Sequence, residues 1–173
     1  METALLEWIH SLSNPVWDRF FKLSDFFGRS FFIVPAVLAA LTWNWHRNRK
    51  NEILLWVLLS LNGWLLIKGL KLGIGRARPE LWDWAVSVKS YSLPSGHALA
   101  AATLFPLMAR LWIQWKPTHR KRAMTATVLM VLYVGIGRLY LGVHWPTDVL
   151  AGWIVGGTQT WVGFRIAARY NKN

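Results

Sequence analysis

The sequence predicts an all-α protein, a polytopic membrane helix bundle of about five transmembrane helices that follows an N-terminal interfacial helix. Three observations lead there. The 173 residues are 54% hydrophobic and only 16% charged, which is too apolar for an ordinary soluble domain of this size. Long apolar segments recur along the chain, and ionisable residues gather at their ends. We therefore expect one integral-membrane domain over residues 1–173, with its active site at one membrane face.

The N-terminal segment, residues 1–27, is expected to lie in the membrane interface. Its charged residues alternate with aromatic ones, a pattern typical of an interfacial helix. Pro15 after Asn14 fits a first helical turn. We interpret Asp18 and Asp25 as neutralising their neighbours Arg19 and Lys22. The first residues lack a basic start followed by an apolar core, so a cleaved signal peptide is not expected.

The transmembrane bundle is expected over residues 28–166, with residues 167–173 as a cytoplasmic tail. About 20 apolar residues span the hydrocarbon core of a bilayer. Segments near that length are residues 28–45, 53–70, 98–115, 123–141 and 149–164.

Basic residues cluster in the loops 46–50 and 116–122, which alternate with the polar segments that carry the chemistry. The total number of Lys and Arg does not separate the two sides, but these two loops contain no acidic residue and form the unneutralised clusters. We expect the protein in the bacterial inner membrane and place these loops in the cytoplasm. The active site then faces the periplasm or the cell exterior. Most tryptophans are interpreted as interfacial anchors, and the roles of Trp82 and Trp84 stay open.

Three cations and one helix start indicate a phosphate site. Lys71, Arg78 and Arg138 each follow or end an apolar segment, and guanidinium groups bind phosphoryl oxygens in pairs. Ser95 is a good N-cap, which directs the amides of Gly96 and His97 toward a bound anion. Taken singly, these residues fit a snorkelling lysine, a solvated arginine and a plain helix cap. Together they favour the phosphate site.

Two histidines supply the expected chemistry. Asp148 follows His144 by four residues, so its carboxylate can hold one ring nitrogen and leave the other free to attack phosphorus. His97 is expected to protonate the leaving oxygen and then to activate water. Cysteine is absent and acidic residues are sparse near these positions, so we expect no metal and no cofactor.

In chain order, the runs Lys71-x6-Arg78-Pro79, Pro94-Ser95-Gly96-His97 and Arg138-x5-His144-x3-Asp148 closely resemble the type 2 phosphatidic acid phosphatase superfamily. The resemblance implies a membrane lipid phosphatase in which His144 is the nucleophile and His97 the acid and base. Members of this superfamily commonly have six spans, so this chain looks like a shortened form. The third motif usually begins Ser-Arg, whereas Gly137 precedes Arg138 here. We interpret that change as the loss of one tolerable hydrogen bond, which predicts that Gly137→Ser is near neutral.

The expected substrate is a membrane lipid phosphate, since the site lies at a membrane face among apolar helices. The order of expectation is undecaprenyl diphosphate, phosphatidylglycerol phosphate and lipid A 1-phosphate, and no residue separates them. A lipid phosphotransferase with the same site remains an alternative. A transporter or scaffold does not require paired histidines beside three cations, and a vanadium-dependent haloperoxidase of this superfamily is soluble and larger. Besides the lipid and the bilayer we expect neither a nucleic-acid partner nor an obligate protein partner.

Overall fold

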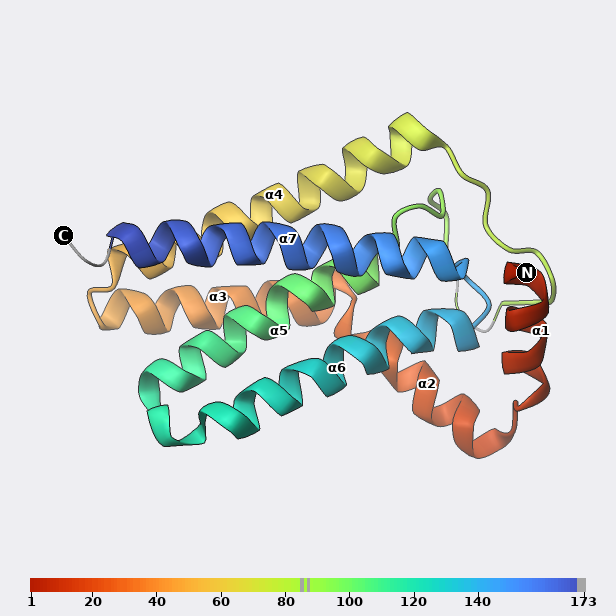
Figure 1. Ribbon diagram of the computed structural model, residues 1–173, viewed down its shortest axis with the longest axis horizontal. Coiled ribbons are helices and arrows are strands. Elements are labelled where there is room, and N and C mark those ends of the chain that lie inside the picture. The colour runs from red at the N-terminus through yellow and green to blue at the C-terminus, as the bar shows by residue number, and fades with distance from the viewer. Residues whose placement is uncertain (85, 87, 171–173) are drawn as a thin grey trace.

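The computed structural model describes residues 1–84, 86 and 88–170, and within these ranges it consists of helices and connecting segments without a strand (Figure 1). This confirms the all-α prediction. The helices are α1 (Glu2–Ser11), α2 (Pro15–Phe27), α3 (Ser30–His46), α4 (Lys50–Ile74), α5 (Gly96–Trp115), the 3₁₀ turn η1 (Pro117–His119), α6 (Arg120–Tyr140) and α7 (Pro146–Tyr170).

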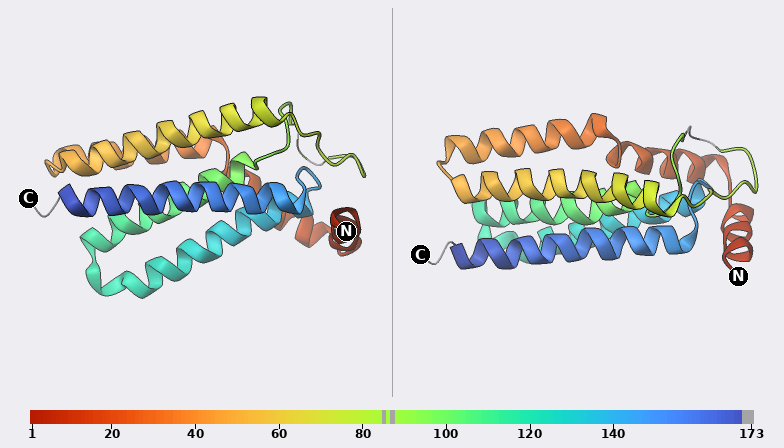
Figure 2. Two further views of the ribbon diagram at one scale, coloured as in Figure 1. Left: turned by 45° about the horizontal axis from the view of Figure 1, so that its top comes forward. Right: turned by 90° about the horizontal axis from the view of Figure 1, so that it is seen from above.

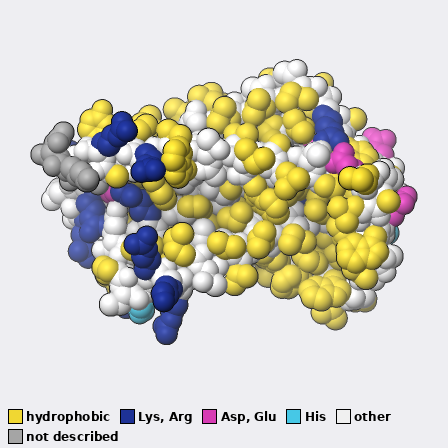
Figure 3. Space-filling model, in the orientation of Figure 1, with side chains coloured by type: hydrophobic (Ala, Val, Ile, Leu, Met, Phe, Trp, Pro, Cys, Tyr) yellow, Lys and Arg dark blue, Asp and Glu magenta, His cyan; other side chains and the backbone are white. Residues whose placement is uncertain are grey.

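Helices α3 to α7 run lengthwise through the molecule, and α1 lies across one end (Figures 1 and 2). Each predicted transmembrane segment corresponds to one of these five helices. The α3–α4 turn, η1 and the end of α7 share one end of the bundle, where Lys and Arg gather on the surface (Figure 3). The segment between α4 and α5 and the α6–α7 turn lie at the opposite end with α1. The two ends therefore separate the basic loops from the motif residues, as predicted.

Within the described residues, α4, α5 and the continuous run Pro117–Tyr140 are long and apolar enough to cross a membrane. The pair α2 and α3 also qualifies as one broken span with a bend of 48°, which gives three spans or four. Helix α7 is as long as α4 at 25 residues, but Gln159, Arg165 and several glycines make it less apolar. The protein is a membrane protein, and the count of five spans stays a prediction.

The predicted N-terminal helix is divided in two at Leu12–Asn14. Asn14 caps α2, because its side-chain oxygen accepts hydrogen bonds from the amides of Val16 and Trp17 at 3.0 and 3.1 Å. Helix α2 then packs along α6, where the Tyr140 hydroxyl donates to Asp18 over 2.7 Å. Aromatic residues of α2 also pack on α6, where Phe20 contacts Tyr133 and Phe21 stacks on Tyr140. At the other terminus α7 continues through Tyr170, past the predicted end of the bundle, and residues 171–173 of the predicted tail lie outside the described residues.

The closest helix contact joins α5 and α7. A Cβ atom on Gly152 would lie 2.7 Å from the Ser95 carbonyl oxygen, and one on Gly156 would lie 2.5 Å from the Leu99 carbonyl oxygen. Small residues four apart allow two helix backbones to approach in this way inside a membrane. At the end of this contact the Ser95 amide donates to the Asp148 carbonyl over 2.9 Å. The approach therefore joins the starts of the two helices.

Arg110, which the sequence places inside an apolar segment, is paired across the bundle. Its guanidinium donates to both carboxylate oxygens of the buried Glu52 on α4, at 2.6 to 3.2 Å. The Arg110 charge is tolerated within the bundle because Glu52 carries the opposite charge and accepts hydrogen bonds from it.

Gly137 has a packing role that sequence reasoning missed. An added Cβ would lie 1.9 Å from the Ser24 Oγ and 2.8 Å from the Ser24 Cβ, so α2 fills the space beside this glycine. The Ser24 hydroxyl is fully buried and donates to the Phe21 carbonyl over 2.6 Å. A serine at residue 137 does not fit while Ser24 stays in place. The interpretation of Gly137→Ser as a near-neutral change did not take this contact into account, and the effect of the variant on activity stays a prediction.

The α5–α7 contact predicts that Gly156→Ala destabilises the protein by about 1 to 3 kcal/mol, because the new methyl group meets backbone that cannot rotate away. The neighbouring Gly157→Ala is the matched control, since an added Cβ there meets nothing within 4 Å. The thermal unfolding midpoints of both variants in one detergent measure the difference. Equal midpoints would contradict the close approach.

The contact between α2 and α6 predicts that Gly137→Ser lowers the thermal midpoint, by an overpacking cost of about 1 to 3 kcal/mol. Adding Ser24→Gly to the same chain removes both clashing atoms and should recover most of that loss. Ser24→Gly alone measures the intrinsic cost of a glycine in α2. A double variant no more stable than Gly137→Ser would show that another contact excludes the serine.

Candidate active site

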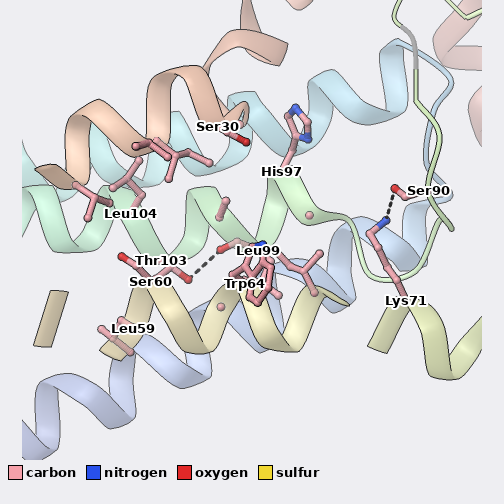
Figure 4. A pocket seen from close by; sticks show the side chains of 18 of the residues that line it. Ser30, Leu59, Ser60, Trp64, Lys71, Ser90, His97, Leu99, Thr103 and Leu104 are labelled. Carbon is pink, nitrogen blue, oxygen red and sulfur yellow. Dashed lines mark hydrogen bonds between the residues drawn. The ribbon is translucent and has the colours of Figure 1, made fainter. Parts of the chain in front are cut away.

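A cavity of about 470 Å³ lies between α3, α4 and α5, and its polar end reaches the motif residues (Figure 4). Most of its wall is apolar. The predicted site residues on its lining are Lys71, Arg78, Gly96, His97, Arg138 and His144. Ser95 and Asp148 lie behind this lining, where Ser95 caps α5 by accepting from the Ala98 amide over 3.4 Å. The structure thus brings together residues from three separate motifs.

The predicted pair of His144 and Asp148 is present. The His144 Nδ1 lies 3.4 Å from the Asp148 Oδ2, and the two side chains are 3% and 0% exposed. Asp148 is itself held by the Trp145 amide at 2.8 Å, by the Ser92 hydroxyl and by Arg76 at 2.8 Å. The carboxylate on which His144 depends is therefore fixed on several sides.

The other nitrogen of His144 faces a cation. Arg78 NH1 lies 3.1 Å from the His144 Nε2, and since a guanidinium has only donors, that nitrogen must be the acceptor. This assigns the proton to Nδ1, toward Asp148. Burial, together with the nearby charges of Arg78 and Lys71, lowers the pKa of His144 to about 3. The ring is therefore neutral near pH 7 and carries a lone pair on Nε2.

Arg78 and Lys71 both donate to backbone carbonyls of the segment Ser90–Tyr91. The Arg78 Nε donates to the Ser90 carbonyl over 2.7 Å, and its NH1 donates to the Val143 carbonyl over 2.6 Å. Lys71 donates to the Tyr91 carbonyl and, over 3.4 Å, to the Ser90 hydroxyl. The bond to Ser90 is drawn as a dashed line in Figure 4. Burial lowers the pKa of Arg78 to about 10, which leaves it charged at neutral pH. Both cations thus have fixed positions on the cavity that His144 also lines.

Arg138 is the most deeply buried cation of the site, with 0% exposure. Its NH1 donates to the Asp25 Oδ1 over 2.5 Å. Its Nε and NH2 have no hydrogen-bond partner among the described residues. A buried guanidinium rarely leaves two donors unpaired, and an anionic ligand in the cavity would satisfy them.

His97 lies next to the same carboxylate. Its Nε2 is 3.1 Å from the Asp25 Oδ1, although the ring is not oriented for a hydrogen bond. Figure 4 shows the ring on the Ser30 side of the cavity, with Lys71 on the other side. A Cβ on Gly28 would lie 2.0 Å from the ring, so the glycine between α2 and α3 makes room for it.

Asp25 is the main site residue that sequence reasoning missed. The interpretation that it neutralises Arg19 and Lys22 is wrong, because it pairs with Arg138, His97 and Arg29. An acidic residue within an aromatic helix was the available signal, since such a group needs a buried partner.

Ser92 and Arg76 were also missed, and both bind Asp148. Trp82 stacks on His10 with ring centroids 4.0 Å apart, and the Trp84 indole donates to the Pro79 carbonyl. These contacts give the two tryptophans packing roles beside the site. Among the described residues, no group of three acidic, histidine or cysteine side chains is placed to hold a metal ion.

Comparison with known proteins gives the context of this geometry. The model of the PAP2 superfamily matches residues 53–172. Phosphatidylglycerophosphatase B of Bacillus subtilis is 34% identical over 132 residues, which cover 75% of this chain and 64% of that protein. Undecaprenyl-diphosphatase of Sulfolobus acidocaldarius is 35% identical over 79 residues, which cover 43% of this chain and 31% of that protein. The chain therefore spans less than two thirds of the length of these curated relatives.

The crystal structure of the transmembrane PAP2 type phosphatidylglycerolphosphate phosphatase from Bacillus subtilis has the same fold. It matches with a TM-score of 0.90 and 27% sequence identity over 97% of this chain and 85% of that one. The family match includes all three motifs, from Lys71 to Asp148. On the motifs, the fold and the family match together, the chain belongs to the PAP2 superfamily.

Proposed function

We propose that this protein hydrolyses a phosphate monoester or diphosphate on a membrane lipid through a phosphohistidine formed on His144. One observation carries the proposal. The neutral His144 ring and the Arg138 guanidinium, which still has free donors among the described residues, line the same cavity. The Nε2 lone pair lies at the cavity wall, where it accepts from Arg78, and it is freed to attack when Arg78 donates to a phosphoryl oxygen instead. Arg138, on the same cavity, has two nitrogens that find no hydrogen-bond partner among residues 1–84, 86 and 88–170. A nucleophile and an anion site thus share one space.

The first step in this proposal transfers the phosphoryl group to the protein. Arg138, Arg78 and Lys71 hold its oxygens, and the amides at the start of α5 add donors. The His144 Nε2 forms a bond to phosphorus while the bond to the leaving oxygen breaks, and His97 gives that oxygen a proton. Asp148 stabilises the positive charge that develops on the His144 ring.

The second step releases phosphate. His97, now without its proton, accepts one from water, and the water oxygen attacks phosphorus as the bond to Nε2 breaks. The products are inorganic phosphate and neutral His144, and His97 ends protonated as it began. Asp25 supports the charged form of His97 through its negative charge 3.1 Å away.

The apolar part of the cavity supports a lipid substrate. Below the cations it is lined by side chains from three helices, among them Val34, Val37, Ile67, Leu99 and Leu104. This wall is apolar apart from the hydroxyl groups of Ser30, Ser60 and Thr103, so it suits a hydrocarbon chain better than a sugar or nucleotide. Undecaprenyl diphosphate was the first expectation, and phosphatidylglycerol phosphate gains support from the relative that aligns over 75% of this chain. Both lipids belong in the test, together with lipid A 1-phosphate.

Purified protein in detergent should release inorganic phosphate from at least one of these three lipids, and excess EDTA should leave the rate unchanged. His144→Ala should remove turnover, because no other group replaces the attacking nitrogen. His46→Ala, an exposed histidine in the last turn of α3, is the control. Phosphate release by folded His144→Ala at the wild-type rate would refute the nucleophile. Loss of activity in EDTA with recovery on adding magnesium would refute the metal-independent reaction.

We also propose that the active site faces the periplasm or the cell exterior. The two basic loops at the opposite end of the bundle, which contain no acidic residue of their own, support this orientation (Figure 3). A single cysteine at Asp83 should then react with an impermeant maleimide in intact cells, and one at Asn48 should react only after permeabilisation. The reverse labelling pattern would place the site in the cytoplasm.

A further inference from the structure

Helix α1 contacts the active site through its first residue. The Glu2 Oε1 accepts hydrogen bonds from the Thr147 amide at 3.0 Å and from the Thr147 hydroxyl at 2.8 Å. The Glu2 Oε2 accepts one from Arg76 NH2 at 2.7 Å. Both oxygens of this carboxylate are therefore engaged by groups next to Asp148.

Arg76 joins the two carboxylates. While its NH2 binds Glu2, its NH1 donates to the Asp148 Oδ1 over 2.8 Å and to the Thr147 hydroxyl over 2.6 Å. The Oδ2 of Asp148 is then the oxygen that faces His144. Because Arg76 holds one oxygen, it limits rotation of the carboxylate and keeps the other directed at the nucleophile.

The Thr147 contact acts on the same helix turn. Thr147 is the second residue of α7, where backbone amides lack partners within the helix and where a negative charge is favourable. Burial raises the pKa of Glu2, but hydrogen bonds from Thr147 and Arg76 outweigh that effect and lower the pKa. Leu6 is fully buried, and His10 stacks on Trp82, so α1 is held in place along its length.

We propose that Glu2 and Arg76 are positioning residues for phosphoryl transfer, which hold Asp148 in the orientation that fixes the His144 tautomer. This inference rests on the proposed function of the same site. It makes α1 a part of the catalytic apparatus, although Glu2 lies outside the three motifs and outside the family match at residues 53–172. Glu2 does not line the cavity, so it acts through Asp148 and does not touch the substrate.

The test is steady-state kinetics of phosphate release by the whole chain in detergent, with a lipid phosphate that the wild-type protein hydrolyses. Glu2→Gln should lower kcat about three- to tenfold with KM unchanged, the size expected for losing one neutral hydrogen bond, because the remaining amide oxygen can still accept one. In an Asp148→Asn background the same change should have no further effect on the residual rate, since the group it positions is already gone. Glu7→Gln is the matched control, an exposed acid on the same helix with wild-type kinetics expected.

Thermal unfolding midpoints separate positioning from general destabilisation. A kcat loss in Glu2→Gln that persists well below its midpoint, and disappears in the Asp148→Asn background, supports the proposal. Wild-type kcat in Glu2→Gln, or an equal proportional loss in the Asp148→Asn background, overturns it and leaves the proposed function intact. A wild-type protein that releases phosphate from none of the lipids removes the proposed function, and the positioning role with it.

Discussion

The close approach of α5 and α7 is the constraint on which the active site depends. Gly152 and Gly156 let the two backbones come within contact distance, and the Ser95 amide then reaches the Asp148 carbonyl. Because Ser95 begins the turn that we propose binds phosphate and Asp148 lies against His144, this one contact sets the distance between the proposed anion site and the proposed nucleophile. In a bilayer, where apolar side chains gain little by leaving lipid, such backbone proximity is a main source of helix association.

Two buried carboxylates organise the polar groups around this contact. Asp148 serves His144, and Asp25 lies beside both His97 and Arg138. Each histidine of the site therefore has its own acidic partner, one from α7 and one from α2. These acids balance part of the buried positive charge, which reduces the cost of keeping cations away from water. The two carboxylates do not neutralise all of this positive charge. Two nitrogens of Arg138 have no partner within the described residues, which leaves the site suited to an anion.

The cavity connects this polar centre to the apolar interior of the bundle. Side chains of α3, α4 and α5 form its apolar wall, and Lys71, Arg78 and Arg138 lie at its polar end. A ligand with one charged end and one hydrocarbon end matches both walls at once. The position of α1 across the same end of the bundle adds a contact with α7 from the aqueous side. The site is thus bordered by helices from nearly the whole chain, including those before the family-matched segment.

The sequence by itself determined the helical class, the five segments that became α3 to α7, and the motif residues, because each depends on local composition or on spacing along one helix. The link between His144 and Asp148 followed from four-residue spacing alone. Only the tertiary structure decided the pairing of Asp25 with His97 and Arg138, and the fit of Ser24 beside Gly137. These contacts join α2 to helices more than 70 residues away in sequence. The same holds for the bridge from Glu2 through Arg76 to Asp148. Pairings between distant segments depend on how helices pack, and no local pattern in the chain encodes that packing.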